Sequence, residues 1–264
     1  MNIFLRELKA NLKSLLIWSG FIVFFIYMGM AKFSAFAGDE EMMKMLEGFP
    51  QELLDVFQMN AFNLTTVSGF FGVMFTYFAL ITAIFAVMLG SDIISKEERD
   101  KTVEFSLTLP ITRSKLITGK ILAALVNCIV FVLVIWGGTI LLSQSYGPDA
   151  SFYEFLRLCI IALFFIEMIF LAIGVLLGCA MKQYKRANSV AVSLLLGTYF
   201  LSIISGLNEN LEFLKYFSPF KYFNPVKLLN ESKFEPVYLW ISLGIVIVSV
   251  IGAYLTYSKR DLYI

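Results

Sequence analysis

Six apolar blocks, separated by polar segments, dominate this sequence. They cover about 14–31, 67–94, 116–143, 155–181, 189–207 and 237–257. A helix of about 20 apolar residues spans the roughly 30 Å hydrocarbon core of a bilayer. A helix also satisfies its backbone polar groups internally, which a lipid environment requires. The pattern therefore predicts an all-α integral membrane protein with six transmembrane helices, organised as a single domain over 1–264.

The composition excludes several classes of function. Hydrophobic residues make up 59% of the chain and charged residues 16%, whereas soluble domains average about 45–50% and about 25%. The chain has no His, which rules out imidazole metal ligands and His-based acid–base catalysis. Its three cysteines form no C-x-x-C motif. We therefore expect no metal site, no catalytic residues and no nucleic-acid partner.

Lysine and arginine positions indicate how the chain is oriented. Fourteen of the 21 lie in 1–13, 95–120, 182–188 and 258–264. Cytoplasmic segments of membrane proteins carry such an excess. We therefore expect a multi-pass protein of the plasma membrane with both termini in the cytoplasm. A cleaved signal peptide ending near Ala35-Phe36-Ala37 is the alternative, but the 18-residue apolar stretch exceeds the usual 7–15.

The first thirteen residues are amphipathic. Apolar and basic side chains take opposite helical faces, with Phe4, Leu5, Leu8 and Leu12 against Arg6, Lys9 and Lys13. Such a helix lies in the membrane interface with its cations near anionic headgroups. We therefore expect an N-terminal interfacial helix over 1–13. A simple extension of the first transmembrane helix is the alternative.

Two places are candidate parts of a substrate pathway. The outer loop 32–66 carries Met42, Met45 and Phe49 at helical spacing before Pro50, and methionine side chains adapt to varied apolar ligands. A packed outer cap is the alternative for this loop. Glu167 lies near the centre of the fourth apolar block, where a carboxyl group costs roughly 2.5–3.5 kcal/mol. We expect it to face the bundle interior, in a functional or a structural role.

The connector between the second and third apolar blocks is short and highly charged. Ser95 and Glu98 form a capping-box pattern, and Glu97 and Lys101 are a favourable i,i+4 pair. Pro110 then ends the predicted helix. A rigid charged helix joined directly to two transmembrane helices can transmit force from a soluble partner. A solvated connector without function is the alternative.

Residues 95–120, which read SKEERDKTVEFSLTLPITRSKLITGK, closely resemble the coupling segment of ABC-2 type ABC transporter permeases. The matching residues are Thr102, Glu104, Leu107, Leu109, Pro110, Arg113, Gly119 and Lys120. Lys101 stands where the family usually has Gly. The resemblance extends to Ser218-Pro219-Phe220, to Asn224-Pro225 and to the ending Ser258-Lys259-Arg260-Asp261.

The resemblance implies a type V exporter-like fold, a second permease subunit (identical or sister) and separate ABC ATPase subunits that bind ATP and Mg. Segment 95–110 would be the coupling helix, and short helices in 208–236 would close the outer end of the pathway. The implied ATPase-coupling residues are Glu97, Glu98, Arg99, Asp100, Lys101, Thr102, Val103, Glu104, Phe105, Leu107, Pro110 and Arg113.

ATP hydrolysis by this chain itself is not expected. A P-loop requires G-x-x-x-x-G-K-[ST], and the only Gly-Lys pair is Gly119-Lys120, with Ser114 at the first glycine position. We therefore expect a non-enzymatic permease without a bound cofactor that exports an apolar or amphipathic substrate, such as a peptide, lipid-like molecule or drug. A secondary transporter, which would show inverted repeats, and a membrane enzyme or assembly factor are the alternatives.

Overall fold

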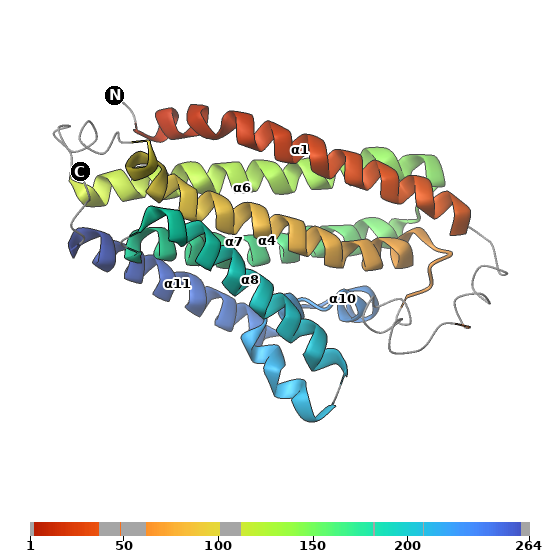
Figure 1. Cartoon of the computed structure of the whole chain (residues 1–264). Helices are drawn as coiled ribbons and strands as arrows, with labels where there is room; N and C mark the ends of the chain where they lie inside the picture. Colours follow the sequence, from red (N-terminus) through yellow and green to blue (C-terminus); the bar gives the residue numbers. More distant parts are fainter. Residues whose placement is uncertain are drawn as a thin grey trace.

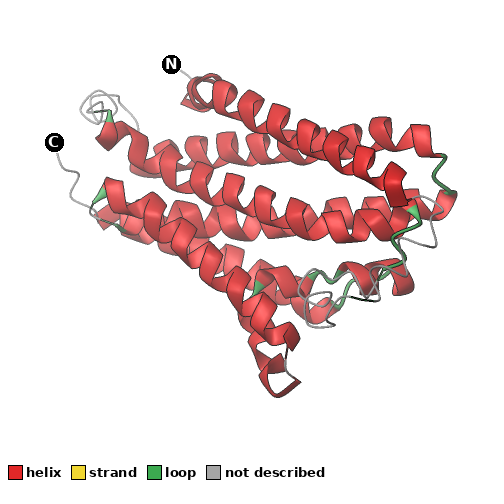
Figure 2. Cartoon of the chain, turned by 45° about the vertical axis from the view of Figure 1, so that its right-hand side comes forward, coloured by secondary structure: helices red, strands yellow, loops and turns green. Residues whose placement is uncertain are grey.

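The computed structural model describes residues 3–36, 48, 62–100, 112–181, 183–207 and 209–259. Six long helices make up most of it: α1 (Ile3–Phe36), α4 (Val67–Arg99), α6 (Arg113–Ser143), α7 (Ala150–Ala180), α8 (Tyr184–Leu207) and α11 (Pro236–Lys259). Four short helices connect them: η2 (Gln144–Tyr146), η3 (Glu209–Phe217), α9 (Pro219–Tyr222) and α10 (Pro225–Glu231). The described residues contain no strand, as Figure 2 shows.

The long helices form a bundle in which α4 and α7 are central (Figure 1). These two helices pack against each other along most of their length. Helix α1 lies along α6, α11 lies along α7, and α8 packs on α4. Both chain termini lie at one end of the bundle, which we call the terminal end. The short helices η3, α9 and α10 lie toward the opposite end, which we call the distal end.

All six long helices are long and apolar enough to cross a membrane. The peripheral helices expose large apolar side chains, among them Phe24 on α1 and Trp240 and Val248 on α11. A soluble protein rarely exposes contiguous apolar surface of this kind, whereas a bilayer covers it. The expected all-α integral membrane fold with six transmembrane helices is confirmed.

Glycines permit the close contact between α4 and α7. A Cβ atom on Gly174 would lie 2.5 Å from the Val87 carbonyl oxygen, and one on Gly90 would lie 2.5 Å from the Leu171 carbonyl oxygen. No side chain fits at these distances, so only glycine lets the two backbones approach this closely. The core of the bundle therefore depends on small residues as well as on large apolar ones.

The structure differs from the expected helix boundaries at the terminal end. Helix α1 is continuous from Ile3 to Phe36, so the described part of 1–13, residues 3–13, extends the first transmembrane helix and is not a separate interfacial helix. Helix α4 continues past 94 to Arg99, and α6 begins at Arg113 instead of 116. With 33 residues, α4 is about 50 Å long and extends beyond a hydrocarbon core of roughly 30 Å. A hydropathy pattern places the end of a transmembrane helix where charged residues begin. In α4 the helix continues, because Lys96 and Glu97 form ion pairs with neighbouring helices.

The predicted outer-loop helices, with Met42, Met45 and Phe49, lie outside the described residues, and so does the part of the predicted coupling helix 95–110 that follows Asp100. The short helices predicted in 208–236 are present as η3, α9 and α10. Asn224 begins α10, because its side-chain oxygen accepts a hydrogen bond from the Val226 amide at 2.9 Å. Pro225 occupies the first turn, where a missing N–H is tolerated.

Candidate functional site

Five charged residues from three helices meet at the terminal end of the bundle. Arg6 and Glu7 come from α1, Lys96 and Glu97 from α4, and Lys120 from α6. We call this group the charge cluster. Glu7 and Lys120 are essentially inaccessible to solvent, and Glu97 is buried as well. Buried charges of this kind must be paired, and the contacts show how the pairing is achieved.

Lys120 joins all three helices through one ammonium group. Its Nζ atom donates a hydrogen bond to the Ile93 carbonyl oxygen of α4 at 2.7 Å. The same atom lies 3.2 Å from Oε1 of Glu97 and 3.9 Å from Oε1 of Glu7. The beginning of α6 is therefore fixed both to the last turns of α4 and to the first turns of α1.

The two carboxylates of the charge cluster each receive more than one cation. Arg6 Nη2 donates to Glu97 Oε1 at 2.6 Å and to Glu7 Oε1 at 3.1 Å. The ammonium group of Lys96 forms a further ion pair with Glu7. Three cations thus surround two acidic groups, and every carboxylate bridges at least two helices.

The charge cluster fixes the relative positions of the three helices more than it adds to the free energy of unfolding. Burying two opposite charges removes them from water, and the lost solvation largely offsets their attraction. Removing one partner, however, leaves an uncompensated buried charge, which typically costs 3–5 kcal/mol. The charge cluster therefore holds three helix ends in a single register, because alternative registers leave a charge unpaired.

The last turn of α4 presents a second set of charges to solvent. Arg99 is half-exposed and donates to Asp100 Oδ1 at 3.1 Å, and it also pairs with Asp92, which lies two turns earlier on the same helical face. Glu98 is buried, whereas Asp100 is exposed. Of the predicted coupling residues before 101, Glu97 and Glu98 thus face into the protein, while Arg99 and Asp100 are accessible to a partner.

The first described residues after 111 are also anchored. The Thr112 side-chain oxygen caps α6 by accepting from the Lys115 amide at 3.3 Å. Arg113 Nη1 donates to the carbonyl oxygens of Tyr257 at 3.3 Å and Ser258 at 3.2 Å, in the last turn of α11. The described residues before 101 thus lead from the charge cluster, and those after 111 are held by an arginine tie to α11.

Glu167 of α7 faces the interior of the bundle, as expected. Its side chain is completely buried, and neither carboxyl oxygen has a hydrogen-bond partner among the described residues. It interacts electrostatically with the buried thiol of Cys128 on α6. The described residues contain no group of three or more His, Cys, Asp or Glu side chains that could hold a metal ion.

Sequence reasoning did not find the charge cluster. Glu7 lies on the same helical face as Phe4, Leu8 and Asn11, which places an acidic group on the side expected to be apolar. Lys120 lies inside the third apolar block. Glu7 and Lys120 are thus opposite charges at two positions that the sequence pattern assigns to apolar surroundings, and such charges need partners. Their pairing required the relative register of α1, α4 and α6, which the sequence does not contain.

Comparison with known families agrees with these features. The family model described as ABC-2 family transporter protein matches residues 1–262, which is almost the entire chain. Comparison with curated proteins found no match. A match over this length, together with six membrane-spanning helices, leads to one conclusion: the chain belongs to the ABC-2 family of transporter proteins.

Proposed function

We propose that this chain is the membrane-spanning permease subunit of an ATP-driven exporter whose ATP hydrolysis is carried out by separate ATPase subunits. Family membership supports a permease role and implies an ABC ATPase partner. The sequence supports the division of labour, because Gly119-Lys120 is not part of a P-loop. In this proposal the terminal end faces the cytoplasm, where the ATPase binds.

The charge cluster is the observation that carries the proposal. Energetic coupling between distant sites travels through ion-pair networks and rigid secondary structure. Here α4 runs from the cluster into the centre of the bundle, where it packs along α7. A displacement of segment 101–111 by the ATPase would therefore move the ends of α4 and α6 together, and Arg6 and Glu7 would bring α1 with them.

The proposed transport pathway lies between this chain and a second permease subunit, identical or sister. The exposed apolar faces of α1, α8 and α11 provide surface for lipid and for such a partner. An apolar or amphipathic substrate, such as an amphipathic peptide, lipid-like molecule or drug, suits the apolar lining of the spans. Met42, Met45 and Phe49 are the residues that we assign to this pathway. Glu167, which is buried inside the bundle, would act on the pathway through the packing of α7.

The test is co-purification of the chain with its ATPase, followed by reconstitution of the complex and measurement of ATP hydrolysis with and without substrate. Phe105→Ala and Leu107→Ala should reduce recovery of the ATPase, since interface energy concentrates in a few buried apolar anchors. Lys9→Ala is the matched control, because Lys9 is exposed at the same end of the bundle.

A charge-reversal variant separates binding from coupling. Replacing Glu97 and Glu98 by Lys should abolish substrate stimulation of ATP hydrolysis, because it adds cations beside Arg6 and Lys120. Membrane insertion should continue, since it depends on the apolar helices and on the positive-inside bias. Normal ATPase recovery in the anchor variants, together with normal stimulation in the charge-reversal variant, would refute the proposed function.

A further inference from the structure

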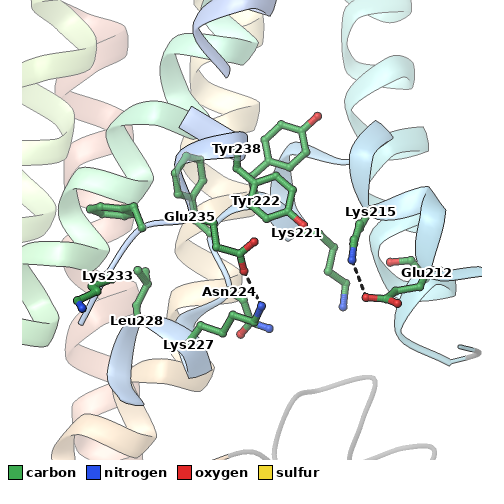
Figure 3. Close-up of a pocket in the computed structure, with 13 residues that line it drawn as sticks. Glu212, Lys215, Lys221, Tyr222, Asn224, Lys227, Leu228, Lys233, Glu235 and Tyr238 are labelled. Atoms are coloured by element: carbon green, nitrogen blue, oxygen red, sulfur yellow. Dashed lines mark hydrogen bonds and ion pairs between the residues drawn. The ribbon is translucent and has the colours of Figure 1, made fainter. Parts of the chain in front are cut away.

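A second charged site lies among the short helices at the distal end of the bundle, and Figure 3 shows the residues that line it. It is a cavity of about 230 Å³ between η3, α9, α10 and the first turn of α11. Four lysines line it: Lys215, Lys221, Lys227 and Lys233. The acidic residues in its wall are Glu212 and Glu235. The described residues of the lining therefore carry more positive than negative charge.

Two of the four lysines are paired with nearby glutamates, whereas Lys221 and Lys233 form no ion pair with any described residue. Lys215 pairs with Glu212 at 2.6 Å, and Lys227 pairs with Glu235 at 2.5 Å. Lys221 lies between these two ion pairs (Figure 3) and forms no ion pair with any described residue. Its side chain is half-buried, and this loss of solvation lowers the pKa of its ammonium group. An anion in the cavity would supply the missing partner.

The walls of the cavity hold polar side chains in fixed positions. The rings of Tyr222 and Tyr238 are stacked with centroids 5.1 Å apart, and the Tyr222 hydroxyl donates to the Tyr216 carbonyl oxygen at 2.5 Å. The side-chain oxygen of Asn224 caps α10. Because that oxygen is occupied, the amide N–H groups of Asn224 are the part of this side chain that a ligand can use as donors.

We propose that this distal cavity binds the phosphate group of an anionic ligand, with Lys221 as its central cation. Lysine binds phosphate as a point charge through charge-assisted hydrogen bonds. The volume is smaller than the roughly 300–1,000 Å³ of pockets that enclose drug-sized ligands, so it suits a headgroup better than a whole substrate. Ser205 of α8 and Tyr238 of α11 line the same cavity. The site thus opens beside the ends of two membrane-spanning helices, which favours a lipid headgroup over free phosphate as the source.

This site is independent of ATPase coupling, so its test does not need the partner. The full-length chain is placed in nanodiscs of phosphatidylcholine, of phosphatidylcholine with phosphatidylglycerol, and of phosphatidylcholine with added inorganic phosphate. Bound lipid is measured by mass spectrometry, and thermal unfolding is followed in all three. The variants are Lys221→Met, Lys221→Arg and Lys233→Met. Lys32→Met is the control, because Lys32 is an exposed lysine on α1 outside the cavity.

Lys221→Met should weaken binding about tenfold, which corresponds to one hydrogen bond to a charged group. Lys221→Arg should retain binding because it keeps the cation, and Lys32→Met should match the wild type. Lys233 is exposed, so Lys233→Met should fold normally and still give a smaller loss. A protective effect of phosphatidylglycerol alone identifies a lipid source, and an effect of phosphate identifies a free anion. Equal anion binding by the wild type, Lys221→Met and Lys233→Met overturns the proposal.

Discussion

The Nζ atom of Lys120 lies 3.2 Å from Oε1 of Glu97, and both side chains are almost completely buried. These residues belong to α6 and α4, the two helices that border segment 101–111. The ion pair therefore links, within the protein, the two helices between which the predicted coupling segment lies. A partner that moves this segment acts on the joint between α4 and α6 that Lys120 and Glu97 form. The two helix ends cannot separate without leaving one of these charges exposed to solvent or unpaired.

This joint predicts strong coupling between two substitutions. Lys120→Met should destabilise the protein by about 3–5 kcal/mol, because it leaves Glu97 and Glu7 with fewer buried cations. Glu97→Gln should also destabilise it. The double variant should lose about 1–3 kcal/mol less than the sum of the single variants, as expected for residues in direct contact. Unfolding in detergent measures all three free energies, and strict additivity would contradict a joint role.

The glycine contact between α4 and α7 gives a second prediction. Gly174→Ala should destabilise the bundle by about 1–3 kcal/mol, the usual range for overpacking, because the new methyl group would meet the rigid Val87 carbonyl at 2.5 Å. Gly137 on α6 is the control, since nothing lies within 4 Å of a Cβ atom there. Gly137→Ala should be neutral or stabilising by about 0.5–1 kcal/mol. Equal effects in both variants would show that the close approach does not matter.

The beginning of α7 should respond to pH. The Ser151 hydroxyl donates to Asp149 at 2.8 Å and the Phe152 amide donates at 3.0 Å, and together they lower the pKa of the Asp149 carboxyl from its ordinary 3.8. A lowered pKa in the folded state means that the stabilisation is present above pH 3.8 and is lost as the pH falls through the folded-state pKa. Asp149→Ala should cost about 1 kcal/mol at neutral pH.

The free energies of unfolding of Asp149→Ala and the wild type should therefore become more similar as the pH falls. Asp149→Asn keeps a capping oxygen and cannot ionise, so it should retain most of the stability at neutral pH and show no loss from this site on acidification. Thermal unfolding across the acidic range measures the three proteins together. A constant difference between wild type and Asp149→Ala at every pH would mean that the charge of Asp149 contributes nothing.

Six apolar blocks in the sequence were enough to predict the number and order of the long helices. Their boundaries were less predictable, because hydropathy treats a charge as the end of a span. Lys96 and Glu97 continue α4 beyond that limit, since ion pairs to Arg6, Glu7 and Lys120 replace their solvation by water. Helix α1 is likewise one continuous helix where an amphipathic pattern suggested a separate interfacial element.

The candidate site was only partly predictable for a related reason. Local motifs located the connector, but the predicted capping box of Ser95 and Glu98 was wrong. Ser95 lies within α4, where its hydroxyl donates to the Ser91 carbonyl oxygen at 2.7 Å, and the residue that caps α6 after the connector is Thr112. The role of Glu97 is different from the surface contact that its position in a charged run suggested. Glu97 and Arg6 are 91 positions apart, and only the packing of α1 beside α4 and α6 brings them together. Side-chain partners across three helices depend on helix register, which no local pattern specifies.

Glu167 gives a fourth prediction, which concerns transport. Glu167→Gln keeps the shape of the side chain and should fold, but it should reduce substrate transport by the reconstituted complex if the carboxyl acts in the pathway. Glu167→Ala should reduce both transport and stability, because it adds a cavity in a fully buried position. Glu154→Gln on the exposed surface of the same helix is the control. Normal transport and stability in both Glu167 variants would remove any functional role.

The tie between Arg113 and α11 gives the last prediction. The final carbonyl groups of a helix lack partners within the helix, and a cation at this end also interacts favourably with the helix dipole, by about 0.3–1 kcal/mol. Arg113 provides both, because it donates to the carbonyl oxygens of Tyr257 and Ser258. Arg113→Ala should therefore loosen the last turn of α11. Lys115→Ala, which removes an exposed cation two residues away, should not.

Hydrogen–deuterium exchange of a peptide from the last turns of α11 measures this effect directly. Loss of about 1 kcal/mol of local stability corresponds to exchange that is about fivefold faster in Arg113→Ala. Arg113→Lys keeps the charge but lacks the planar fork that reaches two carbonyl groups, so its exchange rate should be intermediate. If the tie also restrains the coupling segment, Arg113→Ala should lower substrate-stimulated ATP hydrolysis while the purified chain still unfolds cooperatively. Identical exchange in Arg113→Ala and Lys115→Ala would show that α11 is held by its packing on α7 alone.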